Sequence, residues 1–273
     1  MKLTVLTMIT KPDERQDKWR EALQNYLSFA DEVVCVNGGS KLEFEGVKMI
    51  DREWPDDWKW QQLPDQLNFG KIHCTGDWIL KLDIDMMLSP LDYYKLRKFL
   101  DNFDNENIDS VKLSKLNFVA DMRYYSKSSH PILFRNKPDI GFGWVKDFIE
   151  SDNCVPMRIT GYDYIRGMFE GIMLGSVLAP VSYWNFSYTF KTKKVAKAHY
   201  GRMARAWKLF FNNNNIGQDE EEAWKNFKND LKRKVKRATY KVELGQLPKE
   251  IRSAIKNLTP EQKGYNAWGQ III

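Results

Sequence analysis

Short apolar runs alternate with amphipathic stretches along the N-terminal part of the chain, and this alternation constrains the fold most. Residues 3–9, 32–36 and 47–50 read LTVLTMI, EVVCV and VKMI, and such runs predict buried strands. Between the first two runs, six apolar side chains recur at the spacing of one helix face: Trp19, Ala22, Leu23, Tyr26, Leu27 and Ala30. Alternating strands and helices favour right-handed crossovers. The sequence therefore predicts an α/β fold with a mostly parallel central sheet and flanking helices.

Two aspartates follow the fourth apolar run of this series. A helix is predicted over residues 63–74, and DWILKLDID (77–85) is predicted as the fourth strand, ending in Asp83 and Asp85. Ligands of open α/β sheets bind outside the carboxyl ends of the strands. The loops that follow four strands should meet at that edge, after Ile9, Val36, Ile50 and Leu82. The aspartates are expected to lie there.

The spacing of Asp83 and Asp85 indicates a cation site. Alternate residues of a strand point to the same side, so both carboxylates face one cleft unless the chain turns and separates them. Two ionised carboxylates repel each other unless a cation lies beside them. Mn²⁺ and Mg²⁺ prefer such oxygen ligands and bridge to phosphates. The alternative interpretation is an ordinary polar turn that ends a strand.

Three segments in residues 1–95 resemble GT-A type nucleotide-sugar glycosyltransferases, especially the broad family 2-like group with a DxD motif. The segments are VLTMITKPDE, VVCVNGGS and LNFGKIHCTGDWILKLDIDMML. The last includes Asn68, Phe69 and Gly70, which match an Asn-x-Gly of the relatives. Relatives commonly end the second strand in an Asp-Asp-Gly-Ser type turn. This chain has Asn37 at that point, so the usual carboxylate toward the nucleotide is missing.

The resemblance implies a metal-dependent glycosyltransferase with a GT-A (Rossmann-like) fold. Transfer is expected to invert the anomeric configuration of the sugar. The donor would be a nucleoside-diphosphate sugar, and the acceptor a hydroxyl of a glycan, glycoprotein or lipid-linked glycoconjugate. The cofactor would be Mn²⁺ or Mg²⁺, held by Asp83, Asp85 and a late histidine, His199. The residues expected to contact the donor are Thr10, Lys11, Asn37, Lys71 and Asp83.

An inverting transfer also needs a base that deprotonates the acceptor hydroxyl. The relatives place an acid well after the DxD motif, and the candidates here are Asp147, Asp152, Asp163 and Glu170. Asp163 is favoured because GYDYIRG puts it between aromatic residues, where partial burial would raise its pKa. The alternative interpretation of Asp163 is a helix N-cap.

The remainder of the chain divides into an acceptor half and a helical appendage. We expect a catalytic domain over residues 1–200, with a nucleotide-sugar half (1–95) and an acceptor half (96–200), and a helical appendage over 201–273. The elements predicted after Pro90 are a helix around Tyr93–Phe103, strands at 111–119, 131–135 and 178–183, and a helix over 218–237. Trp224, Phe227, Leu231 and Val235 form the apolar stripe of that last helix.

Charge and cysteine content bear on partners and location. The net charge is +6, and residues 191–241 contain 15 Lys or Arg against five Asp or Glu. That segment suits an anionic membrane surface and has no recognised nucleic-acid motif, so peripheral membrane association is expected and nucleic acid is not. No run approaches a membrane span of about 20 apolar residues. Three widely spaced cysteines form no metal motif, which favours reduced thiols in a cytoplasmic protein.

Other functions make different demands on the sequence. A nucleotidyltransferase usually carries a Gly-rich, Arg-containing loop after the first strand, and TKPDER has no glycine. A dehalogenase-type phosphatase places its DxD on the first strand, whereas this pair follows the fourth. A basic protein that binds nucleic acid or a membrane surface without catalysis is the alternative of a different class.

Overall fold

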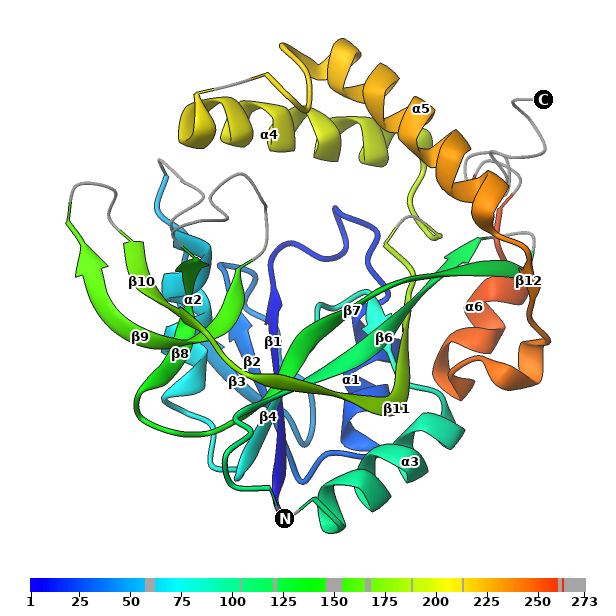
Figure 1. Ribbon diagram of the computed structural model, residues 1–273. Helices are drawn as coiled ribbons and strands as arrows, with labels where there is room; N and C mark the ends of the chain where they lie inside the picture. The colour runs from blue at the N-terminus through cyan, green and yellow to red at the C-terminus, as the bar shows by residue number, and fades with distance from the viewer. Residues whose placement is uncertain are drawn as a thin grey trace.

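The computed structural model describes residues 1–56, 62–103, 105–119, 122–145, 154–164, 168–187, 189–212, 214–259 and 262. Its main feature is a mixed sheet of nine strands within that part of the chain (Figure 1). These strands are β1 (Leu3–Ile9), β2 (Glu32–Asn37), β3 (Lys48–Asp51), β4 (Trp78–Lys81), β5 (Met86–Met87), β6 (Ser110–Val119), β7 (Arg123–Arg135), β11 (Ser176–Asn185) and β12 (Tyr240–Lys241). The helices that accompany the first half are α1 (Trp19–Leu27), α2 (Gln62–Lys71) and α3 (Pro90–Asp101).

The first half of the sheet is parallel and buried on both faces. β1 lies between β2 and β4 and is parallel to both. Its alternate side chains enter two different hydrophobic clusters: Val5 packs with Val33 and Leu80 on one face, and Leu6 packs with Val34 and Ile79 on the other. This explains why the sequence shows continuous apolar runs here and no polar alternation. The predicted α/β fold with flanking helices is confirmed.

The second half of the sheet makes it mixed, where the sequence predicts a mostly parallel one. β7 is antiparallel to both β4 and β6, while β6 and β11 are parallel. β6 ends at Val119 and β7 begins at Arg123. A connection this short can join antiparallel strands only, because a parallel crossover needs about a dozen residues or more.

A second, smaller sheet has no counterpart in the sequence-based prediction. It is a closed barrel of β8 (Ile140–Val145), β9 (Val155–Asp163) and β10 (Met168–Met173). Glycines interrupt its apolar pattern because the strands approach closely: a Cβ on Gly143 would lie 2.7 Å from the Phe169 carbonyl oxygen. One on Gly171 would lie 2.3 Å from that of Arg158. The periodicity that reveals the larger strands is therefore weak here.

Two long helices, α4 (Lys193–Phe211) and α5 (Glu220–Arg237), lie across the top of the molecule in Figure 1. Their contact buries Trp224 and Phe227 of the predicted stripe, and the Tyr200 ring stacks on Phe227 at 3.8 Å. The side chains of Leu231 and Val235 lie outside the described residues. The boundary expected at residue 200, between the catalytic domain and the helical appendage, falls inside α4.

The chain then returns to the main core through two 3₁₀ turns, η2 (Leu244–Gln246) and η3 (Lys249–Ile251), and α6 (Arg252–Lys256). Val242, Leu247, Ile251 and Ile255 join the same cluster as β1. Within the described residues, no helix combines the length and apolarity that a membrane crossing requires. The three cysteines are free thiols, as expected.

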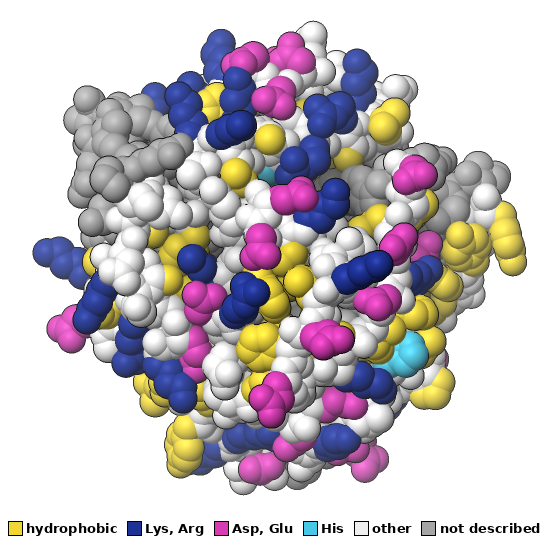
Figure 2. Space-filling view, turned by 180° about the vertical axis from the view of Figure 1, so that it is seen from behind, with side chains coloured by type: hydrophobic (Ala, Val, Ile, Leu, Met, Phe, Trp, Pro, Cys, Tyr) yellow, Lys and Arg dark blue, Asp and Glu magenta, His cyan; other side chains and the backbone are white. Residues whose placement is uncertain are grey.

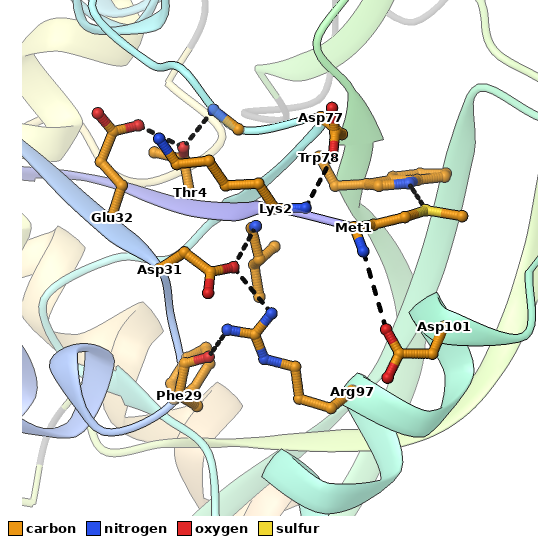
Figure 3. A network of polar contacts seen from close by, with 12 residues as sticks. Met1, Lys2, Thr4, Phe29, Asp31, Glu32, Asp77, Trp78, Arg97 and Asp101 are labelled. Carbon is orange, nitrogen blue, oxygen red and sulfur yellow. Dashed lines mark hydrogen bonds and ion pairs between the residues drawn. The ribbon is translucent and has the colours of Figure 1, made fainter.

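Hydrogen bonds and ion pairs connect the segments at the amino edge of the sheet (Figure 3). Asp31 Oδ2 accepts hydrogen bonds from the Leu3 amide at 2.7 Å and from Arg97 Nη1 at 2.8 Å. Glu32 Oε2 accepts from the Thr4 hydroxyl at 2.6 Å and from the Thr75 amide at 2.7 Å. The chain start is thereby tied to β2, α3 and the residues before β4.

Candidate active site at the carboxyl edge of the sheet

The fourth strand ends before the predicted Asp85, and both aspartates lie on a turn, which is one of the two arrangements expected from the sequence. β4 ends at Lys81, and the Met86 amide donates to the Asp83 carbonyl oxygen at 2.8 Å. The Tyr26 hydroxyl binds the carbonyl oxygens of Asp83, at 2.7 Å, and Met86, at 2.9 Å. The Phe186 amide, just after β11, donates to the Asp85 carbonyl oxygen at 2.8 Å. All these contacts are made to backbone groups of the turn, so neither carboxylate is needed to hold it.

Asp83 is half-buried and is paired with Lys81, the last residue of β4. Its Oδ1 is 2.6 Å from Lys81 Nζ, and 44% of its side chain is exposed. Burial works to raise the pKa of Asp83, but Lys81 outweighs it, and Lys115 and Arg15 add to the lowering. The net pKa is below the usual range, so Asp83 is ionised at neutral pH.

Asp85 has a carboxylate oxygen that its described surroundings leave without a donor. Its Oδ1 is buried and has no hydrogen-bond partner among the described residues. Burial raises the pKa of Asp85; Lys191 lowers it, and Asp83 and Asp17 raise it further. A buried carboxylate oxygen without a donor costs free energy unless a ligand meets it.

A small pocket opens beside Asp85, between the loop after β1 and the segment that leads into α4. Its walls include Asp17, Phe186, Phe190 and Lys191. Asp17 Oδ1 is 2.5 Å from Lys191 Nζ, and only 2% and 6% of the two side chains are exposed. Nothing local in the sequence links residues so far apart, so this ion pair cannot be predicted from it.

His199, the expected third metal ligand, lies on α4 near three cationic side chains. Burial, followed by the charges of Lys191, Arg15 and Arg202, lowers the pKa of His199 to about 3. The imidazole is therefore neutral at pH 7. The described part of the chain contains no group of three or more His, Cys, Asp or Glu side chains arranged to hold a metal. A ligand role for His199 stays a prediction.

Asp83 and Asp85 nevertheless suit a hard divalent cation. Two carboxylates on one turn supply the oxygen donors that Mn²⁺ and Mg²⁺ prefer, with waters and phosphate oxygens to complete the shell. The unpartnered Oδ1 of Asp85 is the observation that fits such a cation best.

The turn after β2 lies at the same edge, but Asn37 is already occupied. Its side chain is fully buried; Nδ2 donates to Asp51 Oδ1 at 2.8 Å, and Oδ1 accepts from the Ser40 amide at 3.0 Å. Asp51 ends β3 in register with Asn37 and is exposed. It supplies a carboxylate where the second-strand turn lacks one. Asp51 is not among the residues predicted from the sequence, although its place at the end of a strand is the signal that could have found it.

The predicted donor residues of the first loop lie beside this turn. The Thr10 hydroxyl accepts from Trp54 Nε1 at 2.7 Å, and the Lys11 amide donates to Ser40 Oγ at 2.6 Å. A Cβ on Gly38 would lie 2.3 Å from Trp54 Nε1, so this contact requires glycine there. Thr10, Lys11 and Asn37 are thus brought together, next to an indole ring.

Lys71 is placed elsewhere. It lies in the last turn of α2, which leads back to the amino end of β4, and its Nζ donates to the Lys137 carbonyl oxygen at 2.9 Å. Asn68 of the same helix joins α2 to β8: it donates to the Phe142 carbonyl oxygen at 2.9 Å and accepts from the Phe142 amide at 2.7 Å. The Asn-x-Gly segment thus has a structural role here.

The candidate bases belong to the smaller sheet or lie outside the described residues. Asp163 is the last residue of β9, which argues against a helix N-cap, and Glu170 lies in β10. Next to Asp163, Tyr162 makes edge contacts with Tyr164 and Phe169 at centroid distances of 5.2 and 5.1 Å. Asp147 and Asp152 fall outside the described residues. A base role for Asp163 or Glu170 stays a prediction.

Comparisons with known proteins give only distant likenesses. No family model and no curated protein matches the chain. Among solved structures, TarS of S. aureus is 13% identical over 85% of this chain and 43% of its own, with a TM-score of 0.39. Glucosyl-3-phosphoglycerate synthase from Mycobacterium tuberculosis, in complex with Mn²⁺ and uridine-diphosphate-glucose, is 19% identical over 43% and 44%, with a TM-score of 0.31. The bifunctional IspDF from Campylobacter jejuni is 11% identical over 50% and 41%, with a TM-score of 0.34.

These likenesses are too weak to indicate a function. The chain spans less than half the length of each of these three proteins. What the candidate site can do must therefore be argued from its own residues.

Proposed function

We propose that this protein is a glycosyltransferase that uses Mn²⁺ or Mg²⁺ to transfer a sugar from a nucleoside-diphosphate sugar to a hydroxyl acceptor. The observation that carries the proposal is the buried, unpartnered Oδ1 of Asp85, two residues from the ionised Asp83, at the carboxyl edge of a parallel half-sheet. This edge is where open α/β sheets bind ligands.

The donor would lie across the ends of β1, β2 and β3 and reach the aspartates with its diphosphate. The residues that would line the nucleotide end of that path are Thr10, Lys11, Asp51 and Trp54, which lie together at this edge. Asp51 would accept hydrogen bonds from ribose or base, and the exposed part of Trp54 would stack on a ring. Lys71 is left out of this set because of its placement, and Asn37 would act by orienting Asp51.

Asp83 and Asp85 would hold the cation, which when bound supplies positive charge that stabilises the leaving nucleoside diphosphate. The chain's own part is to keep both carboxylates in place. Lys81 orients Asp83, and the Tyr26 hydroxyl holds the carbonyl oxygens on both sides of Asp85. Asp163 would take the proton of the acceptor hydroxyl if transfer is inverting, with Asp147 and Glu170 as the other candidates.

Calorimetry with UDP and GDP tests the core of the proposal. Binding of one nucleotide should require Mn²⁺ or Mg²⁺ and should disappear in EDTA. Equal binding with and without metal would contradict the cation role of the aspartates. A screen of nucleotide-sugar hydrolysis with Mn²⁺ would then identify the donor sugar.

The basic α4–α5 surface would bring the protein to an anionic membrane, where a lipid-linked acceptor would be found. Exposed cations on these helices include Lys193, Arg205, Lys225 and Lys236. Attraction of this kind fades over a Debye length of about 8 Å at physiological salt. Sedimentation with anionic and neutral vesicles at two salt concentrations tests it, and equal sedimentation with both would rule it out.

A further inference from the structure

Two asparagines, Asn117 and Asn185, lie side by side near the carboxyl ends of β6 and β11. Asn185 pairs in register with Asn117 and, on its other side, with Met86 of β5, the residue after Asp85. The amide of Phe186, one residue further along the chain, donates to the Asp85 carbonyl oxygen at 2.8 Å. Backbone contacts thus place this asparagine pair directly beside the aspartate turn.

The side chains of the asparagine pair belong to a series of hydrogen bonds with one open end. Ser187 Oγ donates to Asn185 Oδ1 at 2.6 Å, and Asn185 Nδ2 donates to Asn117 Oδ1 at 2.9 Å. Asn117 Nδ2 is the last donor of the series, and it is buried without an acceptor among the described residues. Only 8% of Asn117 is exposed. A buried amide without an acceptor costs free energy, which a ligand oxygen would recover.

Asn117 lies on the face of the sheet that α4 and α5 cover. Val119 comes two residues later on β6 and so shares this face, and it packs with Ala196 of α4 and Trp224 of α5. Tyr125 of β7, which pairs in register with Asn117, packs against the same cluster. In Figure 1, β11 runs upward toward the start of α4. The unpartnered amide therefore lies between the end of the sheet and these two helices.

The asparagine pair differs in charge from the outer surface of the two helices. Figure 2 shows Lys and Arg side chains gathered over the top of the molecule, where α4 and α5 lie. The asparagines beneath them are neutral donors and acceptors. A phosphate binds more strongly to charged donors, which the outer surface offers. An uncharged group such as a hydroxyl therefore suits the inner position better.

The linear chemistry of the donor brings such a group to this place. A nucleoside-diphosphate sugar carries its nucleoside and its sugar at opposite ends of the diphosphate. In the proposed function the nucleoside lies over the ends of β2 and β3, and the diphosphate reaches Asp83 and Asp85. The strand order β3-β2-β1-β4-β7-β6-β11-β5 places β2 and β3 on one side of β4, and β6 and β11 on the other. The sugar would therefore extend toward the asparagine pair.

We infer that Asn117 determines sugar specificity by donating a hydrogen bond to a hydroxyl group of the transferred sugar. This inference rests on the proposed function, because it takes the nucleoside to occupy the β2–β3 side. Ser187 and Asn185 orient the Asn117 amide by binding its oxygen in series. A site with a buried donor rejects a sugar that lacks the matching hydroxyl, because the donor then has no partner. The substrate class is a nucleoside-diphosphate sugar that keeps this hydroxyl.

The test is calorimetry on the full chain with Mn²⁺, in which each free nucleotide is compared with its sugar derivatives. The probes are UDP with UDP-glucose, UDP-galactose and UDP-N-acetylglucosamine, and GDP with GDP-mannose. Wild type should bind one sugar derivative more tightly than the free nucleotide. Asn117→Ala should weaken binding of that derivative by about tenfold, the loss of one hydrogen bond between neutral groups, and leave binding of the free nucleotide unchanged. Asn117→Leu keeps most of the side-chain volume and should have the same effect.

Ser110→Ala is the matched control. Ser110 is a fully buried residue of the same strand whose Oγ also has no partner among the described residues, but it lies at the amino end of β6. Its replacement should change neither affinity. Circular dichroism and melting temperature show whether each variant is folded, and two Asn117 variants are used so that the test does not depend on one of them.

Three results would overturn the inference. An equal loss of affinity for the nucleotide and its sugar derivative would assign Asn117 to the nucleotide or the metal. Unchanged affinity for the derivative in the Asn117 variants would mean that the amide does not contact the sugar, and so would a wild type that binds no derivative more tightly than the free nucleotide. A wild type that shows no metal-dependent binding of UDP or GDP would instead refute the proposed function, and this is seen before any variant is compared.

Discussion

The carboxylates at the two edges of the parallel half-sheet differ in how far neighbouring donors satisfy them. At the amino edge, Asp31 and Glu32 each accept hydrogen bonds from two donors, and Figure 3 shows these hydrogen bonds joining the start of the chain to neighbouring segments. At the carboxyl edge, Asp85 keeps an oxygen that is buried and unpartnered. Polar groups that only stabilise a fold are satisfied within it, whereas a functional site keeps some groups for a ligand.

The pKa values follow the same division. Hydrogen bonds from Arg97 lower the pKa of Asp31, and for Glu32 the Thr4 and Thr75 donors overcome the effect of burial. Burial raises the pKa of Asp85, and Lys191 offsets it only in part. The amino-edge carboxylates are thus more stable as anions in the fold than in the unfolded chain, and Asp85 is less stable.

Asp85→Asn should have the largest effect on turnover and should not lower the stability of the fold. Removal of the charge should lower turnover by about a thousandfold, the scale of a lost electrostatic contact to the transition state. The melting temperature of the metal-free protein should not fall, because an amide is easier to bury than a carboxylate without a donor. Sugar-transfer rates and thermal melts measure the two outcomes.

Asp77→Asn is the matched control for this change. Asp77 is an exposed carboxylate of the amino edge that accepts from the Lys2 amide. Its replacement should leave turnover as it is. If Asp85→Asn also keeps wild-type turnover, Asp85 has no metal role and the contrast between the edges carries no functional meaning.

Asp163→Asn tests a carboxylate that belongs to neither edge. If Asp163 removes the acceptor proton, turnover should fall by about a hundredfold, the usual size of general base catalysis. Donor affinity should stay the same, because the base contacts the acceptor alone. Kinetics together with calorimetry separate these quantities, and a collapse of donor affinity would move the assignment to Asp147 or Glu170.

The sequence predicts the parallel half of this molecule well because the same residues determine local structure and burial there. Leu3–Ile9, for example, is predicted as a strand, and β1 has those bounds. The sequence leaves open whether the chain turns at Asp83, because the contacts that form the turn come from Tyr26 and Phe186, which are distant in sequence. The smaller sheet is missed because close strand packing requires glycines that weaken its apolar pattern.

The sequence places the two aspartates and the loop residues Thr10, Lys11 and Asn37 at the carboxyl edge, but it does not reveal the ion pair beside them. Asp83 and Asp85 stand out because two charges interrupt an apolar run. Lys191 and Asp17 carry no such signal, since a buried ion pair between distant segments exists only after folding. Lys71 is the opposite case: the resemblance implies a donor contact, but α2 runs back toward the amino edge, where Lys71 Nζ donates to the Lys137 carbonyl oxygen.

Asp31→Asn should have the opposite pattern of effects to Asp85→Asn: it should lower stability and leave function unchanged. Asp31 accepts from a backbone amide and an arginine, and 40% of its side chain is exposed. Loss of these contacts, discounted for solvent screening, should reduce the free energy of unfolding by about 1 kcal/mol. Urea denaturation measures this, and metal-dependent UDP binding should be unchanged. A variant as stable as wild type would show that the amino-edge network adds nothing to the fold.

The smallest expected effect is the pH dependence of that same network. The folded pKa of Asp31 lies below its unfolded value of about 3.9, so its stabilisation is complete above that pH and is lost as the pH falls through the folded pKa. The difference in unfolding free energy between wild type and Asp31→Asn should therefore be constant at neutral pH and shrink below about pH 4. Urea titrations of both proteins at a series of pH values measure it. The mutant serves as its own control, because all other carboxylates titrate equally in the two chains. A difference that grows as the pH falls would mean that Asp31 is protonated more readily in the fold, which would remove the contrast with Asp85.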